Sequence, residues 1–180
     1  MIGRRAEQVL NRAVSYAFEH RNEYFTLEHV LLSLIEDEKT ADVLAGCGGK
    51  LEELRTLLED YIDREVPKRP ESTKTENQAG SDNDVIENPT PTLGVQRLIQ
   101  RALFHVQSAG KDEITPEDLL VALFQSKDSF ALSCLVKQNI DRLEVLEYIS
   151  HHLSKDLIPS TEHAPTEVGA DVQDKKGPKI

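Results

Sequence analysis

The sequence predicts an all-α protein made of a tandem repeat of two four-helix motifs with pseudo-twofold symmetry, joined by a flexible polar linker. Aromatic residues make up 5% of the 180 residues and there are nine glycines, a composition that disfavours a many-stranded β architecture. Apolar residues recur at three- and four-residue steps in both halves of the chain, which is typical of amphipathic helices. The two halves of the sequence also resemble each other, which indicates that the chain contains two copies of one motif.

The internal repeat is visible when Thr26 is aligned with Thr115, which places the two halves 89 positions apart. Eight pairs of residues are identical at this ungapped offset, mostly at positions expected to face a core. They are Arg12 and Arg101, Ala13 and Ala102, Thr26 and Thr115, Glu28 and Glu117, Leu31 and Leu120, Leu34 and Leu123, Leu54 and Leu143, and Leu57 and Leu146. We infer that one four-helix unit has been duplicated.

The first repeat, residues 1–65, is expected to form four helices. An apolar stripe marks the first helix, and a short loop leads to Thr26, whose hydroxyl can cap the second helix by accepting from a free backbone N–H. Thr40 is expected to open a short third helix, which a group of glycines ends. The expected helices are 2–18, 27–35, 40–44 and 51–62.

The second repeat, residues 91–154, follows the same plan. Gly110 ends its first helix. Thr115 then supplies an N-cap, followed by Pro116 in the first turn and by two first-turn acids, Glu117 and Asp118, which the helix dipole favours. The expected helices are 98–106, 116–124, 130–136 and 140–149.

Two polar segments separate or follow these repeats. Residues 66–90 contain three prolines and few apolar side chains, so they cannot bury enough surface to offset the entropy of ordering them. Residues 155–180 have the same character and are expected to be a flexible tail that leads to a further module. A flexible chain of 26 residues has an r.m.s. span of roughly 28 Å, which would keep the domain near that module.

The charge and the apolar pattern exclude several classes of partner. A formal net charge of −11 argues against nucleic-acid binding, which needs a cationic surface. No apolar run approaches the roughly 20 residues that cross a bilayer, and no signal peptide is evident at the start. Cys47 and Cys134 are too few for a disulfide framework, which fits the reducing cytoplasm. We therefore expect a cytoplasmic protein without nucleic-acid or membrane partners.

The sequence also gives little support for a metal site or for catalysis. The six histidines form no zinc-ligand motif. Glu19, His20, Glu23, Glu28 and His29 could form an acid–base cluster only with an oriented pocket, which their spacing does not provide. A P-loop requires Gly-Lys followed by Ser or Thr, whereas Gly49-Lys50 is followed by Leu51. We expect no catalytic residues, no cofactor and no metal in this chain.

Three segments carry a resemblance to a known family. They are Glu19-His20-Arg21-Asn22-Glu23, Phe25-Thr26-Leu27-Glu28-His29-Val30-Leu31-Leu32 and Gln100-Arg101-Ala102-Leu103-Phe104-His105-Val106-Gln107-Ser108. With the ending Tyr148-Ile149-Ser150-His151, they resemble the amino-terminal Clp repeat domain of ClpA-type Clp ATPases, the ATP-binding specificity subunits of Clp protease. The resemblance covers residues 1 to about 153, and the linker between the repeats is longer than in the ClpA pattern.

This resemblance implies a protein-binding domain of a hexameric AAA+ unfoldase. Such a domain, a monomer in isolation, docks the adaptor ClpS and protein substrates for delivery to the ClpP protease. ATP and magnesium are then expected only in the AAA+ modules, which this chain lacks. The alternative is a free-standing Clp-repeat regulator without an ATPase, and a downstream Gly-x4-Gly-Lys-Thr motif would separate the two.

The resemblance also implies four partner-binding residues: Glu23, Glu28, Thr92 and Arg142. Two carboxylates can receive a partner's lysine, an arginine can bind a carboxylate, and a threonine can hydrogen-bond at the rim. Each position also has a structural interpretation. Glu28 falls in a first helical turn, as does its counterpart Glu117, Thr92 fits an N-cap, and Arg142 fits a solvated helix face.

Overall fold

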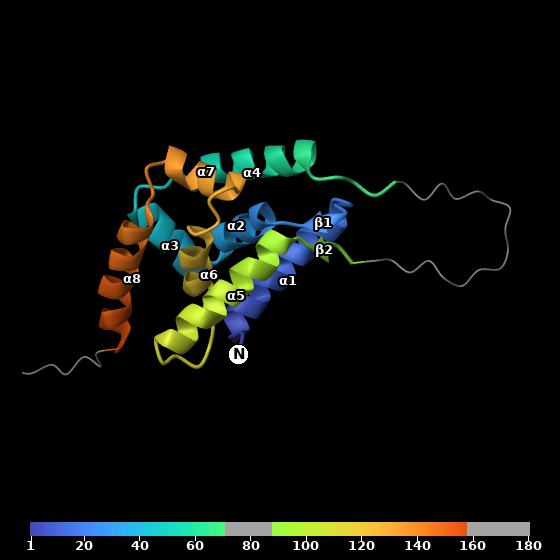
Figure 1. The fold of residues 1–180 in the computed structure, drawn as a ribbon. Coiled ribbons are helices and arrows are strands. Elements are labelled where there is room, and N and C mark those ends of the chain that lie inside the picture. The colour runs from blue at the N-terminus through green and yellow to red at the C-terminus, as the bar shows by residue number, and fades with distance from the viewer. Residues whose placement is uncertain (71–87, 158–180) are drawn as a thin grey trace, which may run out of the picture.

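Helices form almost all of the regular structure in the computed structural model, which describes residues 1–70 and 88–157 (Figure 1). In chain order the elements are α1 (Arg4–Glu19), β1 (Tyr24–Phe25), α2 (Leu27–Glu36), α3 (Glu38–Gly46), α4 (Leu51–Glu65), β2 (Thr90–Pro91), α5 (Leu93–Ser108), α6 (Pro116–Leu123), α7 (Phe130–Lys137) and α8 (Arg142–Leu157). The all-α prediction with four helices in each repeat is confirmed. Most of the predicted linker and most of the predicted tail lie outside the described residues.

Helix starts follow their caps, and four of them differ from the predicted positions. α1 begins at Arg4, two residues later than expected. α3 begins at Glu38 because the side chain of Asp37 accepts from the Thr40 backbone N–H at 3.1 Å, so Thr40 lies inside the helix. α5 begins five residues earlier than expected, since Thr92 acts as its N-cap. α8 begins at Arg142 and continues to Leu157, three residues into the predicted tail.

The two repeats match at two different offsets. Through the first two helices the buried positions coincide at 89, so that Val9, Ala13 and Leu31 correspond to Leu98, Ala102 and Leu120. Through the last two helices the offset is 91, because Leu123 and Ala131 are eight positions apart, whereas the corresponding Leu34 and Thr40 are six positions apart. At this offset the buried positions Thr40, Val43, Leu44 and Leu54 correspond to Ala131, Cys134, Leu135 and Val145.

This shift corrects two of the predicted sequence pairs. Leu143, expected to match the fully buried Leu54, is 64% exposed, and the residue buried at the corresponding place is Val145. Leu57 is likewise partly exposed, at 36%. The pairs Leu54 with Leu143 and Leu57 with Leu146 are therefore coincidences of a leucine-rich sequence, whereas the duplication itself is supported by the burial pattern.

The same two offsets relate the left-handed backbone positions. Arg21 and Gly110, 89 positions apart, have φ of 57° and 68° and follow α1 and α5. Gly48 and Asn139, 91 positions apart, have φ of 86° and 58° and follow α3 and α7. A left-handed residue lets the chain reverse directly after a helix, and glycine adopts it without a steric cost. The backbone path is thus shared even where the residue type is not.

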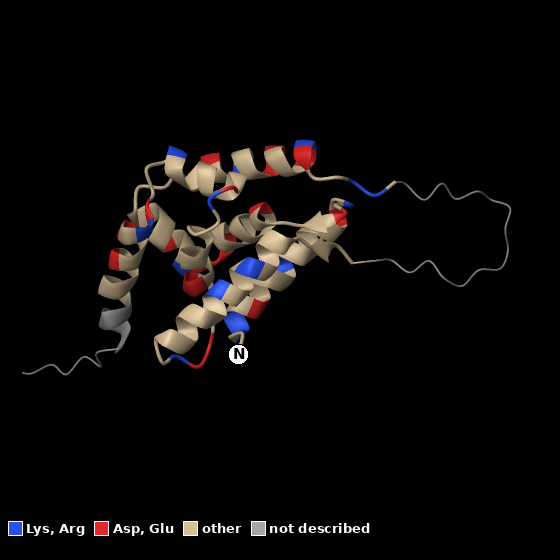
Figure 2. Ribbon diagram, in the orientation of Figure 1, with Lys and Arg blue, Asp and Glu red and all other residues tan. Residues whose placement is uncertain are grey.

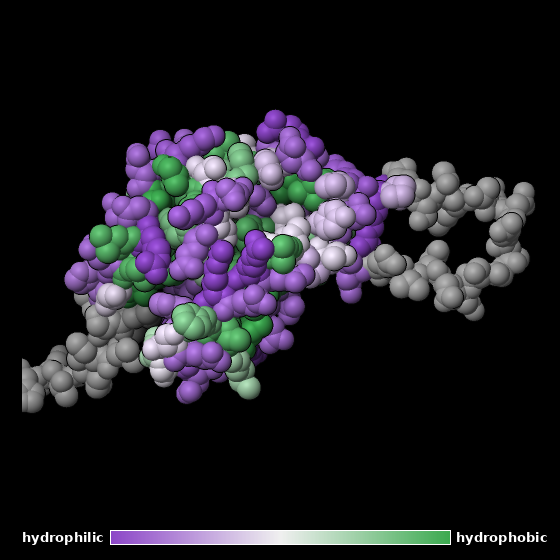
Figure 3. All heavy atoms as spheres, viewed as in Figure 1, coloured by the Kyte–Doolittle hydropathy of each residue, from purple (hydrophilic) through white to green (hydrophobic). Residues whose placement is uncertain are grey.

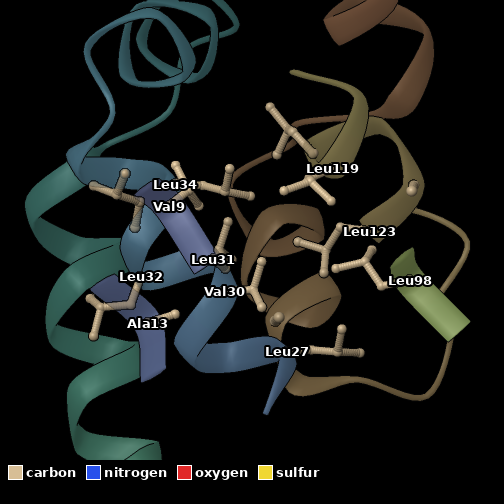
Figure 4. Packing of buried hydrophobic residues seen from close by; sticks show 14 of the residues in the cluster. Val9, Ala13, Leu27, Val30, Leu31, Leu32, Leu34, Leu98, Leu119 and Leu123 are labelled. Carbon is tan, nitrogen blue, oxygen red and sulfur yellow. The ribbon is translucent and has the colours of Figure 1, made fainter. Parts of the chain in front are cut away.

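A single hydrophobic core joins the two repeats. The buried apolar residues of both halves belong to one cluster, in which α2 and α6 pack against each other. Leu31 of α2 lies between Val9 of α1 and Leu119 of α6 (Figure 4). Nine consecutive residues of α2 are buried, because this helix is covered by α1, α4, α6 and α7. Each repeat therefore completes the core of the other.

The segments that precede α1 and α5 are exchanged between the repeats. Thr90–Pro91, before α5, pairs in parallel with Tyr24–Phe25 of the first repeat. Ile2, before α1, forms the corresponding bridge with Ile114 of the second repeat. Their hydrogen bonds match as well: Thr92 N donates to Phe25 O, and Gly3 N donates to Ile114 O, both at 3.0 Å. The repeats are thus interlocked by backbone pairing as well as by the core.

Candidate protein-docking surfaces

The end of the molecule formed by β1 and β2 brings two of the predicted residues together. Glu23 O accepts from Thr90 N at 3.1 Å, so the strand that leads into α5 lies directly beside Glu23. The Glu23 side chain is exposed, Tyr24 next to it is 38% exposed, and Thr92 is half-buried. Glu23, Tyr24, Thr90 and Thr92 are called the β-pair surface below. It offers a carboxylate, a phenol ring and hydroxyls to solvent.

Glu28, the second predicted acid, lies in the interior. It is 7% exposed, and one of its carboxylate oxygens accepts from the Ala131 backbone N–H at 3.3 Å, in the first turn of α7. Its counterpart Glu117 also reaches the other repeat, where it binds Arg5, which in turn binds the α3 cap Asp37 at 2.7 Å. A buried acid at a helix N-terminus stabilises that helix. Glu28 therefore has a structural role in joining the repeats.

Arg142 is separated from the β-pair surface. It is the exposed first residue of α8, and α8 lies at the opposite end of the molecule from β1 and β2 (Figure 1). The four predicted residues thus divide into a close pair, Glu23 and Thr92, one buried acid, Glu28, and one remote cation, Arg142. One partner reaches both ends only by extending across the molecule.

A buried hydrogen-bond network fixes the backbone behind the β-pair surface. Thr26 N donates to His29 Nδ1 at 3.0 Å, so that nitrogen carries no proton, and His29 Nε2–H donates to Asn22 Oδ1 at 3.0 Å. Burial, with a smaller contribution from His20, lowers the pKa of His29 from 6.5 to about 4. The ring is therefore neutral near pH 7, and protonation would place a donor against the Thr26 N–H.

The outer face of α5 has a different character. Its sequence contains Arg97 and Arg101 but no acid, and Figure 2 shows blue without red along this helix. Two adjoining hollows of about 380 and 400 Å³ run beside it and share Arg97, Arg101 and Gln125. Leu93 and Phe104 on the same helix are 59% and 72% exposed. The hollow of about 380 Å³ and the exposed Phe104 are called the α5 groove.

Other kinds of site have no support in the described part of the chain. Among residues 1–70 and 88–157 no group of three or more His, Cys, Asp or Glu side chains could hold a metal ion. Within those same ranges no helix combines the length and the apolar character that crossing a membrane requires. Cys47 and Cys134 are both unpaired.

Comparison with known families identifies the architecture. The family model described as the Clp repeat (R) N-terminal domain matches residues 1–138, more than half of the chain. The chain belongs to this Clp N-domain family. A ClpA homolog protein of Fuscovulum blasticum is 37% identical to it over 165 residues, which is 92% of this chain and 19% of that protein. This Clp N-domain therefore spans about a fifth of the length of that relative.

Solved Clp N-domains share the fold at low sequence identity. The Hsp104 N-terminal domain from Candida albicans matches with a TM-score of 0.65 and 11% identity, covering 84% of this chain and 91% of that one. The ClpV N-domain in a complex with VipB peptide matches with a TM-score of 0.63 and 19% identity, covering 85% and 87%. The fold is therefore common to distant Clp N-domains that are 11% and 19% identical to this chain.

Several residues of this Clp N-domain were not singled out from sequence. Arg5 joins the repeats through Glu117 and Asp37 but stands in no recognisable motif. Asn22 lies in one of the segments that resemble the Clp family, but its support of His29 was not predicted. One available signal was the identity of Glu28 and Glu117 within the repeat, which favours a shared internal role over a role in one binding site. The α5 groove had a weaker signal, a helix with two arginines and no acid in an acidic protein.

Proposed function

We propose that this chain is the amino-terminal protein-binding domain of a ClpA-like AAA+ unfoldase, and that it docks a ClpS-type adaptor and protein substrates for proteolysis by ClpP. The observation that carries the proposal is the match of residues 1–138 to the Clp N-domain family, supported by 37% identity to a ClpA homolog. ATP and magnesium would act in AAA+ modules outside this chain. The full-length protein would be a cytoplasmic hexamer, whereas the isolated domain would be a monomer.

The β-pair surface is our proposed site of adaptor docking. Glu23 is exposed on a backbone held by pairing to β2, so its carboxylate is presented from a fixed position. Thr92 lies one strand away, although its hydroxyl also accepts from Val95 N at 3.4 Å as the α5 cap. A lysine of the adaptor facing Glu23 would fix the register of the complex. Arg142 would make a second, separate contact, and Glu28 would act by holding α7.

Isothermal titration calorimetry with a ClpS-type adaptor tests this assignment. We expect one-to-one binding to the wild-type domain, weakened most in a double variant that carries Glu23→Lys and Arg142→Glu. The loss of affinity in each single variant then gives the contribution of one end of the molecule to adaptor binding. A matched control is Glu7→Lys, which reverses an exposed acid in the first turn of α1, at the other end of that helix from β1.

The two parts of the proposal fail in different ways. Unchanged affinity in the double variant would reject the site while leaving the function intact. No binding of any ClpS-type adaptor by the wild-type domain would reject adaptor docking itself.

A further inference from the structure

The first repeat contains a closed version of the α5 groove. Arg12, Tyr16 and Glu36 line a cavity of only about 20 Å³ beside α1. Their counterparts at the 89-residue offset are Arg101, His105 and Gln125, which line the hollow of about 380 Å³ in the α5 groove. The same place in the fold is therefore filled in one repeat and open in the other.

An ion-pair network closes the first-repeat site. Glu36 Oε2 lies 3.5 Å from Arg12 Nε, and Glu36 Oε1 accepts from Arg55 Nη1 of α4 at 3.0 Å. This carboxylate connects α1, α2 and α4 and fills the space between them. All three side chains are partly exposed, so the network contributes little to stability. Its effect is to close the first-repeat site, because the Glu36 carboxylate occupies the space and neutralises the charge of Arg12.

The second repeat lacks this carboxylate. Gln125 stands where Glu36 stands, and Leu146 stands where Arg55 stands at the 91-residue offset. Arg101 keeps only a 3.3 Å hydrogen bond from Nη1 to Ser126 Oγ, and within the described ranges neither Arg101 nor Arg97 forms an ion pair. The groove thus has two guanidinium groups that are not ion-paired within the described part of the chain, although Asp128 lines the adjoining hollow together with both of them.

Apolar surface lies beside these charges. Phe104, at the position of Ser15 in the first repeat, is 72% exposed and lines the groove together with Gln100 and Ser108. Green side chains appear among the purple ones on the face shown in Figure 3. An aromatic ring and two arginines that line one hollow are the kinds of side chain that anchor protein–protein interfaces.

We propose that the α5 groove binds an acidic, amphipathic segment of a protein substrate, one of whose carboxylates takes the place that Glu36 holds in the first repeat. Arg101 receives this carboxylate, Arg97 receives a second one, and an apolar side chain of the segment covers Phe104. The 180-residue chain has a formal net charge of −11, which repels acidic segments in general. The local positive charge of Arg97 and Arg101 therefore directs an acidic segment to this surface. This site is separate from the β-pair surface proposed for the adaptor.

Fluorescence anisotropy with a labelled peptide of alternating Glu and Leu tests the proposal. We expect salt-sensitive binding to the wild-type domain, and no binding of the matching peptide in which Lys replaces every Glu. Arg97→Glu with Arg101→Glu should weaken binding by at least about tenfold, the effect of roughly 1.4 kcal/mol. The control, Arg4→Glu with Lys39→Glu, makes the same charge change at exposed first-repeat positions and should leave affinity within about twofold.

A nearly isosteric variant sharpens the test. Gln125→Glu supplies the missing carboxylate from within the protein and should close the groove as Glu36 closes its counterpart, so peptide affinity should fall several-fold without loss of the fold. Phe104→Ser should also weaken binding, because it removes the apolar contact. Amide shifts in ¹H–¹⁵N spectra should map the bound peptide to α5 and residues 125–128.

Three outcomes would overturn the proposal. They are wild-type affinity in the Arg97→Glu, Arg101→Glu variant, amide shifts centred on α1 or the β-pair surface, and self-association of the domain that this variant abolishes, which would make a second copy the occupant. Adaptor binding is measured on the same variants. If the Arg97→Glu, Arg101→Glu variant loses peptide binding but keeps adaptor binding, the result concerns the groove alone. If peptide binding is kept and adaptor binding is lost, the result concerns adaptor docking alone.

Discussion

In the first repeat a neutral histidine closes the start of α2, whereas in the second repeat a charged aspartate closes the start of α6. Thr26 and His29 form one capping box, with Asn22 behind the ring. Thr115 and Asp118 form the other, in which Lys111 stands at the position of Asn22 and donates to Asp118 Oδ1 at 2.8 Å. In both boxes the N-cap backbone N–H donates to the side chain three residues later, although one of these side chains is neutral and the other is charged.

The comparison teaches that the duplicated fold preserves hydrogen-bond geometry more strictly than residue type. A ring nitrogen and a carboxylate oxygen both accept from the N-cap N–H. Each then needs a second partner of the right kind, an acceptor for the histidine N–H and a cation for the aspartate. The residue that supports the capping box, Asn22 in one repeat and Lys111 in the other, therefore changes together with the capping side chain.

The largest expected effect tests the offset of 91 between the last helices. Leu54→Ala and Val145→Ala remove fully buried side chains, so we expect losses of about 3 and about 2 kcal/mol in unfolding free energy. Leu143→Ala, at a 64% exposed position, should cost less than about 0.5 kcal/mol. Urea denaturation measures all three. If Leu143→Ala lowered the unfolding free energy as much as Val145→Ala, the last helices would correspond at an offset of 89 instead of 91.

Acid should weaken the first capping box through His29. Because its pKa is about 4 in the folded protein and 6.5 in the unfolded chain, the unfolded chain binds more protons between these values, and stability falls as pH drops. We expect His29 to account for a loss of about 2 kcal/mol between pH 7.5 and pH 5. Denaturation of His29→Gln at the same pH values is the control. Equal acid dependence in both proteins would contradict the assignment.

Exchanging one box for the other tests whether its partner must change with it. Asp118→His alone leaves the ring N–H facing the ammonium of Lys111, which should cost about 2 kcal/mol. Adding Lys111→Asn supplies the acceptor that Asn22 provides in the first repeat, and should recover about half of that loss. The thermodynamic coupling of the two changes, from denaturation of both singles and the double, is the measurement. Additive effects would mean that the two positions are independent.

The smallest effects concern the left-handed turns. Gly110→Ala meets no atom within 4 Å, so its cost of about 1 kcal/mol would come from the backbone conformation alone. Asn139→Gly should have the opposite sign, a gain of about 0.5 kcal/mol, because asparagine is at a position where its counterpart Gly48 is unstrained. Differential scanning calorimetry can compare the two. A destabilised Asn139→Gly would show that its side chain has a role of its own.

Sequence patterns alone were enough for the helical architecture and the duplication. The apolar stripes of α1, α2 and α4 predicted their positions closely, since periodic burial determines helix faces. The extra residues before α7 were missed because Leu143 and Leu146 gave identities at the earlier offset. The exchange of Ile2 and Thr90 between repeats could not be foreseen, since single residue pairs in parallel bridges leave no periodic signal.

For the candidate site, the family resemblance predicted which residues contact a partner, but it could not predict whether each of them is exposed or where it lies in the fold. Glu23 and Thr92 lie together, but Glu28 points into the junction with α7 and Arg142 lies at the far end. Burial of a first-turn acid depends on what packs over that turn, here a helix about a hundred residues away in the chain. The α5 groove is open where Gln125 stands at the position of Glu36, a difference that residue identities between the repeats do not reveal.

The crossed leading segments bear on how such a chain could have arisen. The stretch before α1 bonds to the second half at Asp112 and Ile114, and the stretch before α5 bonds to the first half at Glu23 and Phe25. An ancestor with a single unit would have had no surface of its own for that stretch, and two molecules would have had to trade arms to satisfy it. Fusion of two such units would join a symmetric pair of molecules in one polypeptide, in which the two halves could diverge.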